Sequence, residues 1–239
     1  MDIINVGSRI TNDYIFPVKG GYVLVDTGSE KEFEHFRSKL QEKMIEPKHI
    51  AFIFITHAHD DHTGFLNELM HYTEAKIILH PKAAEEIRQG RNTFIGGCPS
   101  RFTRMVFKQM ARRGHSFPPL EKVFEDRLLL VDGENKSELE KALAVRIIET
   151  PGHTGCSLSL LRDDGILFCG DAAMNGFPSS HRAAMLIDYP DRFCESWIKI
   201  IALKPKIIYP GHGKPFPVSD LEKNLPWIRK MKLYPLLKA

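Results

Sequence analysis

The chain has 239 residues, of which 43% are hydrophobic, and its formal net charge is +3. This length and composition allow a full buried core and fit one large α/β domain, so we expect residues 1–239 to form a single domain. The small charge disfavours a nucleic-acid partner. No apolar run approaches the length of a bilayer span, and the N-terminal residues lack the basic start and apolar core of a signal peptide. We therefore expect a cytoplasmic protein without a membrane span.

Predicted strands and helices alternate in the first part of the chain. Short N-terminal strands lead to the apolar run 23–25, which ends in Asp26, Thr27 and Gly28. The hydrophobic spacing then predicts an amphipathic helix near residues 30–43, a strand over 50–55, a helix after Gly64 and a strand over 75–80. This mixture of elements predicts a layered α/β architecture.

The strand over 50–55 ends in a dense group of metal-ligand side chains, THAHDDHTG at residues 56–64. His57 and His59 are two residues apart, so on an extended backbone they project to one side. Asp61 and His62 follow on the turn and can face a second ion, so one loop can serve two metals. The alternative is a helix N-terminus, in which Asp60 or Asp61 caps the next helix and the histidines are solvated.

A basic amphipathic segment follows the strand at 75–80. Between Arg88 and Arg113 the chain has seven basic residues and no acidic one. Phe102, Val106 and Met110 recur every four residues and predict one apolar face of a helix. We expect a helical insertion over residues 88–125, bounded by turn-forming segments.

This insertion has three interpretations, of which one is contact with a membrane surface or a nucleic acid. As a lid or cap, it would close over the site, line the pocket with Phe102 and Met110, and attract an anionic substrate through Arg104 and its basic neighbours. As a structural element, it would pack its apolar face on the rest of the domain or on a second subunit and leave the arginines solvated. A homodimer through this segment therefore stays open.

Three more ligand-type residues follow predicted strands in the second part of the chain. Strands are predicted at 144–148, 165–169 and 206–209, and each leads into a glycine-containing turn. The turns carry His153, Asp171 and His212, and a helix is predicted over residues 192–203. Glycine allows positive φ at such turns and lets loops crowd around a small centre. Four strand-end loops of this kind predict a metal centre.

In the order and context of these motifs the chain resembles the metallo-β-lactamase superfamily, whose pattern His-x-His-x-Asp-His, His, Asp, His is complete here. The resemblance covers the chain from near residue 3 to about 216, apart from the insertion. It implies an αββα four-layer sandwich with the metals at one edge of the sheets and Asp26 in support of the ligands. It also implies the metal ligands, which are His57, His59 and His153 for the first ion, Asp61, His62 and His212 for the second, and Asp171 for both.

Asp171 narrows the choice of branch. The β-lactamases that name the superfamily generally lack this bridging aspartate, so the resemblance favours glyoxalase II-like thioesterases, lactonases and phosphodiesterases. Lactonases similar to this chain carry a tyrosine three residues later, where Met174 stands, and this weakens a homoserine-lactonase assignment. His59 stands where the diiron oxygen-reducing branch tends to carry an acidic ligand, which disfavours iron redox chemistry.

A centre of this kind predicts hydrolysis by a metal-bridging hydroxide. Two divalent ions about 3.5–4 Å apart lower the pKa of a shared water and polarise the substrate oxygen. Asp61 and Asp171 are the predicted catalytic residues, since Asp61 can also orient the nucleophile or pass its proton to the leaving group. Nitrogen and carboxylate ligands suit zinc, with iron or manganese as alternatives. The four cysteines form no Cys-x-x-Cys pair, so neither a disulfide framework nor a thiolate zinc site is predicted.

The substrate we expect is a small ester, lactone or thioester, because the insertion combines basic and apolar character. A phosphodiester of a small molecule or nucleic acid is the alternative. A third hypothesis is a regulatory or partner-binding protein that keeps the fold and metals and has only weak hydrolase activity. His115 in the insertion and His181 in the loop after Asp171 are further candidate substrate contacts.

Overall fold

The computed structural model describes residues 3–111 and 115–236. Its contacts divide the chain into two compact units: unit 1 comprises residues 1–92 and 115–145, and unit 2 comprises residues 93–114 and 146–239. The segment 93–114 thus belongs with the C-terminal part of the chain. The predicted insertion at 88–125 is therefore shared between the two units.

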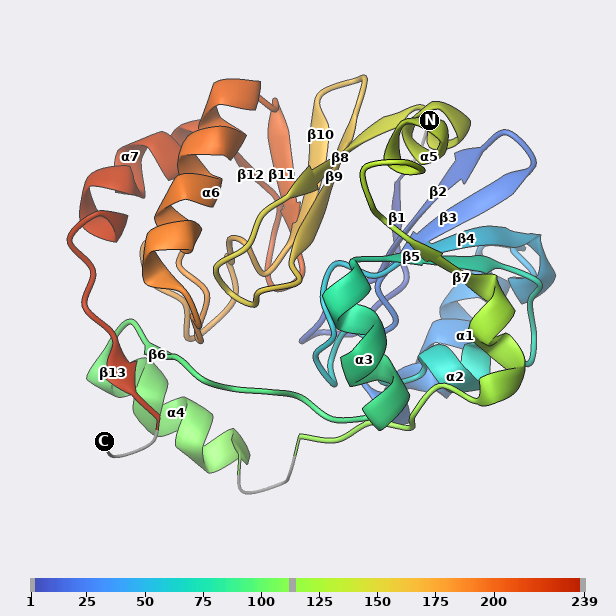
Figure 1. Ribbon diagram of the computed structural model, residues 1–239, viewed down its shortest axis with the longest axis horizontal. Helices are drawn as coiled ribbons and strands as arrows, with labels where there is room; N and C mark the ends of the chain where they lie inside the picture. The colour runs from blue at the N-terminus through green and yellow to red at the C-terminus, as the bar shows by residue number, and fades with distance from the viewer. Residues whose placement is uncertain (1–2, 112–114, 237–239) are drawn as a thin grey trace. The chain divides into compact units, whose positions relative to one another are not determined.

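Unit 1 is built on a six-stranded sheet with the order β1-β2-β3-β4-β5-β7 (Figure 1). The strands are β1 (Ile4–Asn5), β2 (Tyr14–Val18), β3 (Gly21–Val25), β4 (Ile50–Phe54), β5 (Lys76–Leu79) and β7 (Leu128–Leu130). The pairs from β3 to β7 are parallel, whereas β1 and β2 pair in antiparallel fashion. Because the carboxyl ends of parallel strands meet at one edge of a sheet, Asp26 after β3 lies beside the loop 56–64 after β4.

The helices of unit 1 pack through aromatic and aliphatic side chains. They are α1 (Phe33–Glu42), α2 (Leu66–Leu69), α3 (Pro81–Gln89) and α5 (Lys136–Leu143), with 3₁₀ turns η1 (Glu30–Glu32), η2 (Pro47–His49) and η3 (Lys122–Arg127). The rings of Phe33, Phe36 and Phe65 have centroids 4.8 to 6.3 Å apart. Phe65 directly follows the loop 56–64, so this aromatic cluster holds the end of that loop against α1.

Unit 2 contains a five-stranded sheet with the order β12-β11-β10-β9-β8. Its strands are β8 (Val145–Glu149), β9 (Leu158–Arg162), β10 (Ile166–Gly170), β11 (Ile207–Pro210) and β12 (Phe216–Pro217). β10 and β11 are parallel neighbours. Asp171 follows β10 and His212 follows β11 by one residue, so the same strand-end rule brings these two side chains to one edge of the sheet.

The core of unit 2 lies between this sheet and two helices, α6 (Pro190–Leu203) and α7 (Ser219–Ile228). Phe193, Trp197 and Ile200 recur at helical spacing on α6, and each is fully buried against the sheet residues Leu167 and Ile208. Figure 1 shows α6 running alongside the strands. The apolar face of α6 therefore determines how this helix lies on the sheet.

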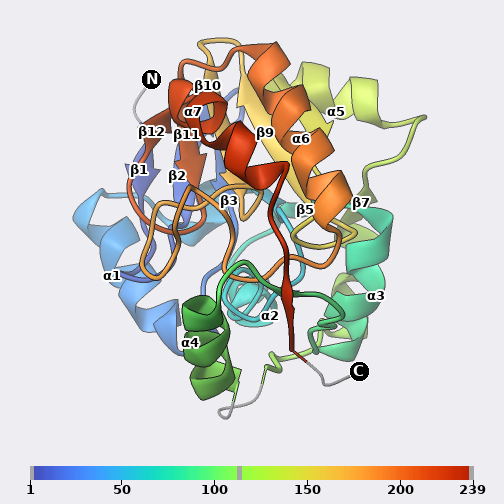
Figure 2. The ribbon, with the colours of Figure 1, turned by 90° about the vertical axis from the view of Figure 1, so that its left-hand side faces the viewer.

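The remaining elements of unit 2 are α4 (Arg101–Ala111) and the two-stranded pair β6 (Gly97–Cys98) and β13 (Tyr234–Pro235). They lie together and apart from β10–β12 in both views (Figures 1 and 2). α4 packs through Phe107, which is buried with Cys98 and Leu186. Phe102 and Met110, on the face predicted from the periodicity, remain 48% and 43% exposed. Thr103 is also buried on the inner face, and because it is polar a hydrophobicity pattern does not assign it to that face.

The predicted strands and the helices at 30–43 and 192–203 correspond to observed elements, whereas α3, α5 and α7 were not predicted. The helix expected after Gly64 is only four residues long. Two helices end in an unusual way: α5 is followed by Ala144 and α6 by Lys204, each in the left-handed conformation with φ of 52°. Glycine usually occupies that position. Within the described residues, no helix combines the length and apolar character needed to cross a membrane.

Candidate metal centre

The seven predicted metal ligands are divided between the two units, and each unit groups its own share. In unit 1, the loop after β4 brings three imidazole rings together. The ring centroid of His57 lies 4.6 Å from that of His59 and 4.2 Å from that of His62. All three side chains are buried. Three imidazoles cannot all be buried with positive charge, so this cluster favours neutral rings, the form that binds metals.

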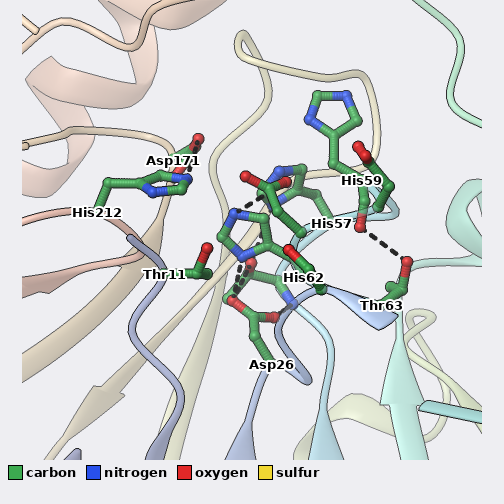
Figure 3. Close-up of polar contacts among 12 residues, drawn as sticks. Thr11, Asp26, His57, His59, His62, Thr63, Asp171 and His212 are labelled. Carbon is green, nitrogen blue, oxygen red and sulfur yellow. Dashed lines mark hydrogen bonds and ion pairs between the residues drawn. The ribbon is translucent and has the colours of Figure 1, made fainter. Parts of the chain in front are cut away.

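Asp26 fixes the orientation of this cluster (Figure 3). Its carboxylate accepts hydrogen bonds from the Thr56 backbone N–H at 2.7 Å and from the Thr56 hydroxyl at 2.8 Å. It also lies 2.9 Å from Nδ1 of His62. A carboxylate can only accept, so Nδ1 of His62 carries the proton and Nε2 carries the lone pair that metal binding requires. The supporting role predicted for Asp26 therefore has a geometric basis within unit 1.

Thr56 extends the same arrangement to a second ring. Its hydroxyl lies 3.0 Å from Nδ1 of His57 while it donates to Asp26. The hydroxyl proton is directed to the carboxylate, so the His57 ring donates from Nδ1 and offers Nε2. Thr56 was not among the predicted site residues. The signal that could have identified it is its position, directly between the strand and the first histidine.

Asp61 lies on the same loop and is partly exposed. Its Oδ1 is 3.8 Å from Nε2 of His62, the nitrogen that Asp26 leaves available. An imidazole nitrogen and a carboxylate oxygen on one turn can share one divalent ion. The pair predicted for the second metal is thus adjacent within unit 1.

Asp60, between the predicted ligands His59 and Asp61, contacts Asn92 and His115 of its own unit. Its Oδ1 accepts from Nδ2 of Asn92 at 2.5 Å and lies 3.3 Å from Nδ1 of His115. The hydrogen bond with Asp60 raises the pKa of His115 above its usual value. His115, a predicted substrate contact, is therefore bound to the ligand loop of its own unit. Asn92 and Asp60 were not predicted, because only the tertiary fold joins residues 32 positions apart.

A second buried carboxyl group, Asp13, lies behind the cluster. Burial raises the pKa of Asp13 well above its ordinary value, although a hydrogen bond from the Gly28 backbone N–H, at 2.8 Å, acts in the opposite direction. The nearby charge of Asp26 raises it further. The neutral form of Asp13 is thereby favoured, and Asp26 is the carboxylate that faces His62.

In unit 2, Asp171 lies between two histidines. Its Oδ2 is 3.6 Å from Nε2 of His153 and 3.5 Å from Nε2 of His212. Nδ1 of His153 lies 2.7 Å from the carbonyl oxygen of Leu186, which only accepts, so His153 presents Nε2 to the carboxylate side. All three ligand side chains are buried. A carboxylate flanked by two imidazole nitrogens is the arrangement expected of a residue that contacts two ions.

The turn that carries His212 depends on a glycine. Gly213 has φ of 86°, and a Cβ atom there would lie 2.1 Å from the carbonyl carbon of Asn175. The Asn175 backbone N–H donates to the carbonyl oxygen of His212 at 2.9 Å. Glycine at 213 therefore allows the loop after β10 and the loop after β11 to pack backbone to backbone.

The loop after Asp171 also holds other candidate residues. The His181 ring stacks on Trp227 of α7, with centroids 4.3 Å apart and planes 18° apart, and its Nδ1 lies 3.1 Å from Oδ1 of Asn224. This predicted substrate contact therefore anchors its loop to α7. Phe102 of α4 contacts Phe177 of the loop, with centroids 5.8 Å apart. Arg104 is half-buried on the same helix.

Asp188 connects the start of the α4 segment to the His153 loop. Its Oδ1 accepts from the backbone N–H groups of Ile95 and Gly96, at 3.2 and 3.0 Å. Burial raises the pKa of Asp188. Burial likewise raises the pKa of Cys98, beneath α4, to about 11, so its thiol stays protonated and does not offer a thiolate ligand.

Comparisons with known proteins agree with this arrangement. A family model described as the metallo-beta-lactamase superfamily matches residues 6–212. A Drosophila melanogaster protein named beta-lactamase-like protein 2 homolog is 26% identical over 89% of this chain and 62% of its own length. A hydroxyacylglutathione hydrolase of Nitrosococcus oceani is 27% identical over 68% of this chain and 48% of its own length. The chain thus spans less than two thirds of these curated relatives.

A solved structure shares the fold. It is described as an archaeal metallo-beta-lactamase superfamily protein, ST1585 from Sulfolobus tokodaii, and it aligns with a TM-score of 0.64 over 92% of this chain and 80% of that chain. The sequence identity is 24%, so the likeness concerns the fold. The α/β fold class predicted from the sequence is confirmed.

Proposed function

The chain belongs to the metallo-β-lactamase superfamily, and from that membership we propose that it is a dinuclear metal-dependent hydrolase. The observation that carries the proposal is Asp171, whose carboxylate oxygen lies between the Nε2 atoms of His153 and His212. The members of the superfamily that hydrolyse β-lactams generally lack such a bridging aspartate. The proposal therefore favours the wider hydrolase branch over antibiotic hydrolysis.

We assign the ligands as the motif pattern implies. The first ion would be held by His57, His59 and His153, the second by Asp61, His62 and His212, and Asp171 would contact both. The hydrogen bonds within each unit support this assignment, because they leave Nε2 of His57, His62 and His153 directed to ligand positions. The donor set, imidazole nitrogen and carboxylate oxygen without thiolate, fits zinc, and it also accepts iron or manganese.

Two divalent ions bound by these residues would activate water and polarise the scissile bond at neutral pH. The protein's own contribution is orientation and proton handling. Asp26 and Thr56 keep two rings in the tautomer that binds metal. Asp61 is partly exposed, so it can exchange a proton with a leaving group while it faces His62. No serine or cysteine nucleophile is required.

The substrate we propose is a small ester, lactone or thioester with an anionic and an apolar part. The exposed phenylalanine and methionine side chains and the basic residues of α4 support this choice. The similarity to a hydroxyacylglutathione hydrolase supports a thioester among the three. A phosphodiester is the second candidate, since the hydrolase branch that the chain resembles includes phosphodiesterases.

The bridging role of Asp171 can be tested by metal analysis. We expect Asp171→Asn to lower the bound zinc from two ions per chain and to abolish hydrolysis, because asparagine loses the charge that two cations share. Metal content is measured by elemental analysis of the purified protein, and folding by circular dichroism. Asp164→Asn is the matched control, since Asp164 is exposed and pairs only with Arg162 among its described ion pairs. A variant that keeps two tightly bound ions would refute the assignment.

The reaction class is tested on the same preparation. A panel of carboxyl esters, thioesters, lactones and phosphodiesters is assayed before and after metal removal by a chelator and after metal is restored. We expect turnover of one acyl class that disappears with the metal and returns with it. Turnover confined to phosphodiesters selects the second candidate, and activity that survives complete metal removal excludes both.

A further inference from the structure

The outward face of α4 carries large apolar side chains that the described residues of unit 2 leave largely exposed. Phe102, Met105 and Met110 are 48%, 61% and 43% exposed. At about 100° per residue Phe102 and Met105 lie on the side of the helix away from Phe107, which packs against Cys98 and Leu186, whereas Met110 lies closer to the Phe107 side. α4 therefore packs on unit 2 through one apolar face and exposes further apolar side chains to which a partner can bind.

Two aromatic residues from distant parts of unit 2 enlarge this outward face. Phe177, which contacts the Phe102 ring, is 83% exposed. Tyr234 of β13 is 36% exposed, and the Arg101 guanidinium lies 5.8 Å from the centre of its ring. We call Phe102, Met105, Phe177 and Tyr234 the α4 patch. Exposed apolar side chains are ordinary when isolated, but several of them gathered around one helix mark an interaction surface.

The surroundings of the α4 patch are positively charged. Arg101 and Lys108 are exposed on α4, on the flank next to Met105. Lys230 and Lys232 are exposed in the segment that leads into β13. The complementary partner is therefore negatively charged as well as apolar.

We propose that the α4 patch docks reversibly on an anionic lipid bilayer. An exposed helix with an apolar stripe, flanking cations and aromatic side chains is suited to lie in the plane of a membrane interface, with its apolar side chains among the upper acyl carbons. Each exposed Lys or Arg adds attraction to an anionic surface. Tyrosine and phenylalanine side chains also suit the membrane interface, where the rings contact apolar acyl carbons and the tyrosine hydroxyl contacts water. This inference concerns only unit 2 and does not depend on the proposed hydrolase activity.

The test is flotation of the full-length, metal-loaded protein with lipid vesicles. One set contains phosphatidylcholine alone and the other contains phosphatidylcholine with one quarter phosphatidylglycerol. We expect binding to the anionic set, and a partition coefficient that falls as salt is raised, because salt screens the cations. For Arg101→Gln with Lys108→Gln we expect a loss of about fivefold for each removed charge. For the double variant Phe102→Ser with Phe177→Ser we expect loss of vesicle binding at every salt concentration, because these substitutions remove apolar contacts and leave the cations in place.

The matched control lies in unit 1. Lys43 and Met44 form an exposed basic and apolar pair, with Met44 92% exposed, so Lys43→Gln with Met44→Ser removes similar groups from another surface. Its vesicle binding should equal that of the unaltered protein. The thermal midpoint of each variant establishes that it is folded.

Three results would overturn the proposal. One is failure of the folded protein to float with anionic vesicles, and another is equal binding by the α4 patch variants and the control. The third is a wild-type dimer, seen by light scattering, that the Phe102 and Phe177 substitutions convert to a monomer without any vesicle binding. In that case the α4 patch binds a second copy of the chain.

Discussion

Asp26 has a backbone φ of 63°, and its carboxylate accepts hydrogen bonds from three donors. Asparagine would fit the same space, but its amide N–H₂ must face at least one of the groups that now donate to Asp26. Facing Nδ1 of His62, the amide would require that nitrogen to accept, which moves the ring proton to Nε2. The metal-binding nitrogen of His62 would then be blocked.

We therefore predict that Asp26→Asn lowers zinc affinity by about 10- to 100-fold, the range typical for loss of such a supporting partner. Affinity is measured by competition with a chromophoric chelator. Asp164→Asn, on the surface of unit 2, is the control and should bind zinc normally. Unchanged zinc affinity in Asp26→Asn would mean that the His62 tautomer is not set by this hydrogen bond.

His115 and Asp60 provide a test that depends on pH. The hydrogen bond with Asp60 raises the pKa of His115, so the folded state binds this proton more tightly than the unfolded chain does. The stabilisation is fully present below the unfolded pKa of about 6.5 and is lost as pH rises through the folded value. In Asp60→Asn we predict a lower His115 pKa, measured by NMR titration of the ring.

The same substitution should reduce the free energy of unfolding more at pH 5.5 than at pH 8.5, as measured in urea. Asp126→Asn, at an exposed position of unit 1, is the control and should show no such difference. A stability difference between wild type and Asp60→Asn that stays constant across pH would contradict the assignment of the pair.

At the scale of elements, α6 supports the loop that carries Asp171. The indole Nε1 of Trp197 donates to the carbonyl oxygen of Ala172 at 2.7 Å, and the ring is fully buried. Replacement by phenylalanine removes the donor and leaves a buried carbonyl oxygen without it. We predict that Trp197→Phe costs about 1–3 kcal/mol of unfolding free energy, plus a cavity contribution, in urea denaturation.

A control lies one position away on the same helix. Ile198 is 43% exposed, so Ile198→Ala should change the unfolding free energy by no more than about 0.5–1 kcal/mol. Equal effects of the two substitutions would show that α6 contributes through helix propensity and not through the bond to Ala172.

The strand-end loops were predictable because strands and ligands both leave local signals. Short apolar runs followed by His or Asp and glycine identify β4, β10 and β11 with their loops. α7 was not predicted because it contains Pro226, which a sequence pattern treats as a break, whereas Pro81 stands at the first position of α3, where proline favours a helix start that was overlooked. The inner face of α4 was not predicted because Phe107 packs on residues 79 positions away in sequence, at Leu186.

At the scale of the whole molecule, the sequence did not reveal how the chain divides. A single domain was expected, and that expectation remains a prediction beside the two compact units. The segment 93–114 joins unit 2 through contacts with Ile187, Asp188 and Tyr234, which lie about 90 to 140 positions away. No local pattern carries such pairings. The seven-residue ligand set likewise remains a prediction, supported by the grouping within each unit.

Metal bound by the proposed ligands should stabilise the folded chain, because the unfolded chain does not hold these side chains together. Zinc at 100 times its dissociation constant would add about 2.7 kcal/mol, which corresponds to a rise in thermal midpoint of roughly 5–10 °C for a chain of this size. Scanning calorimetry with and without zinc measures it. Asp171→Ala should show a much smaller rise. An equal rise in both proteins would place the stabilising ion elsewhere.

The left-handed residues after α5 and α6 have a practical consequence for all of these experiments. Ala144 and Lys204 each strain the backbone where glycine would not, at a cost of about 1 kcal/mol per residue. Ala144→Gly and Lys204→Gly should therefore raise thermostability without touching a proposed ligand, as a denaturation curve would show. A chain strengthened in this way offers an engineering background in which disruptive substitutions such as Trp197→Phe still yield folded protein for measurement.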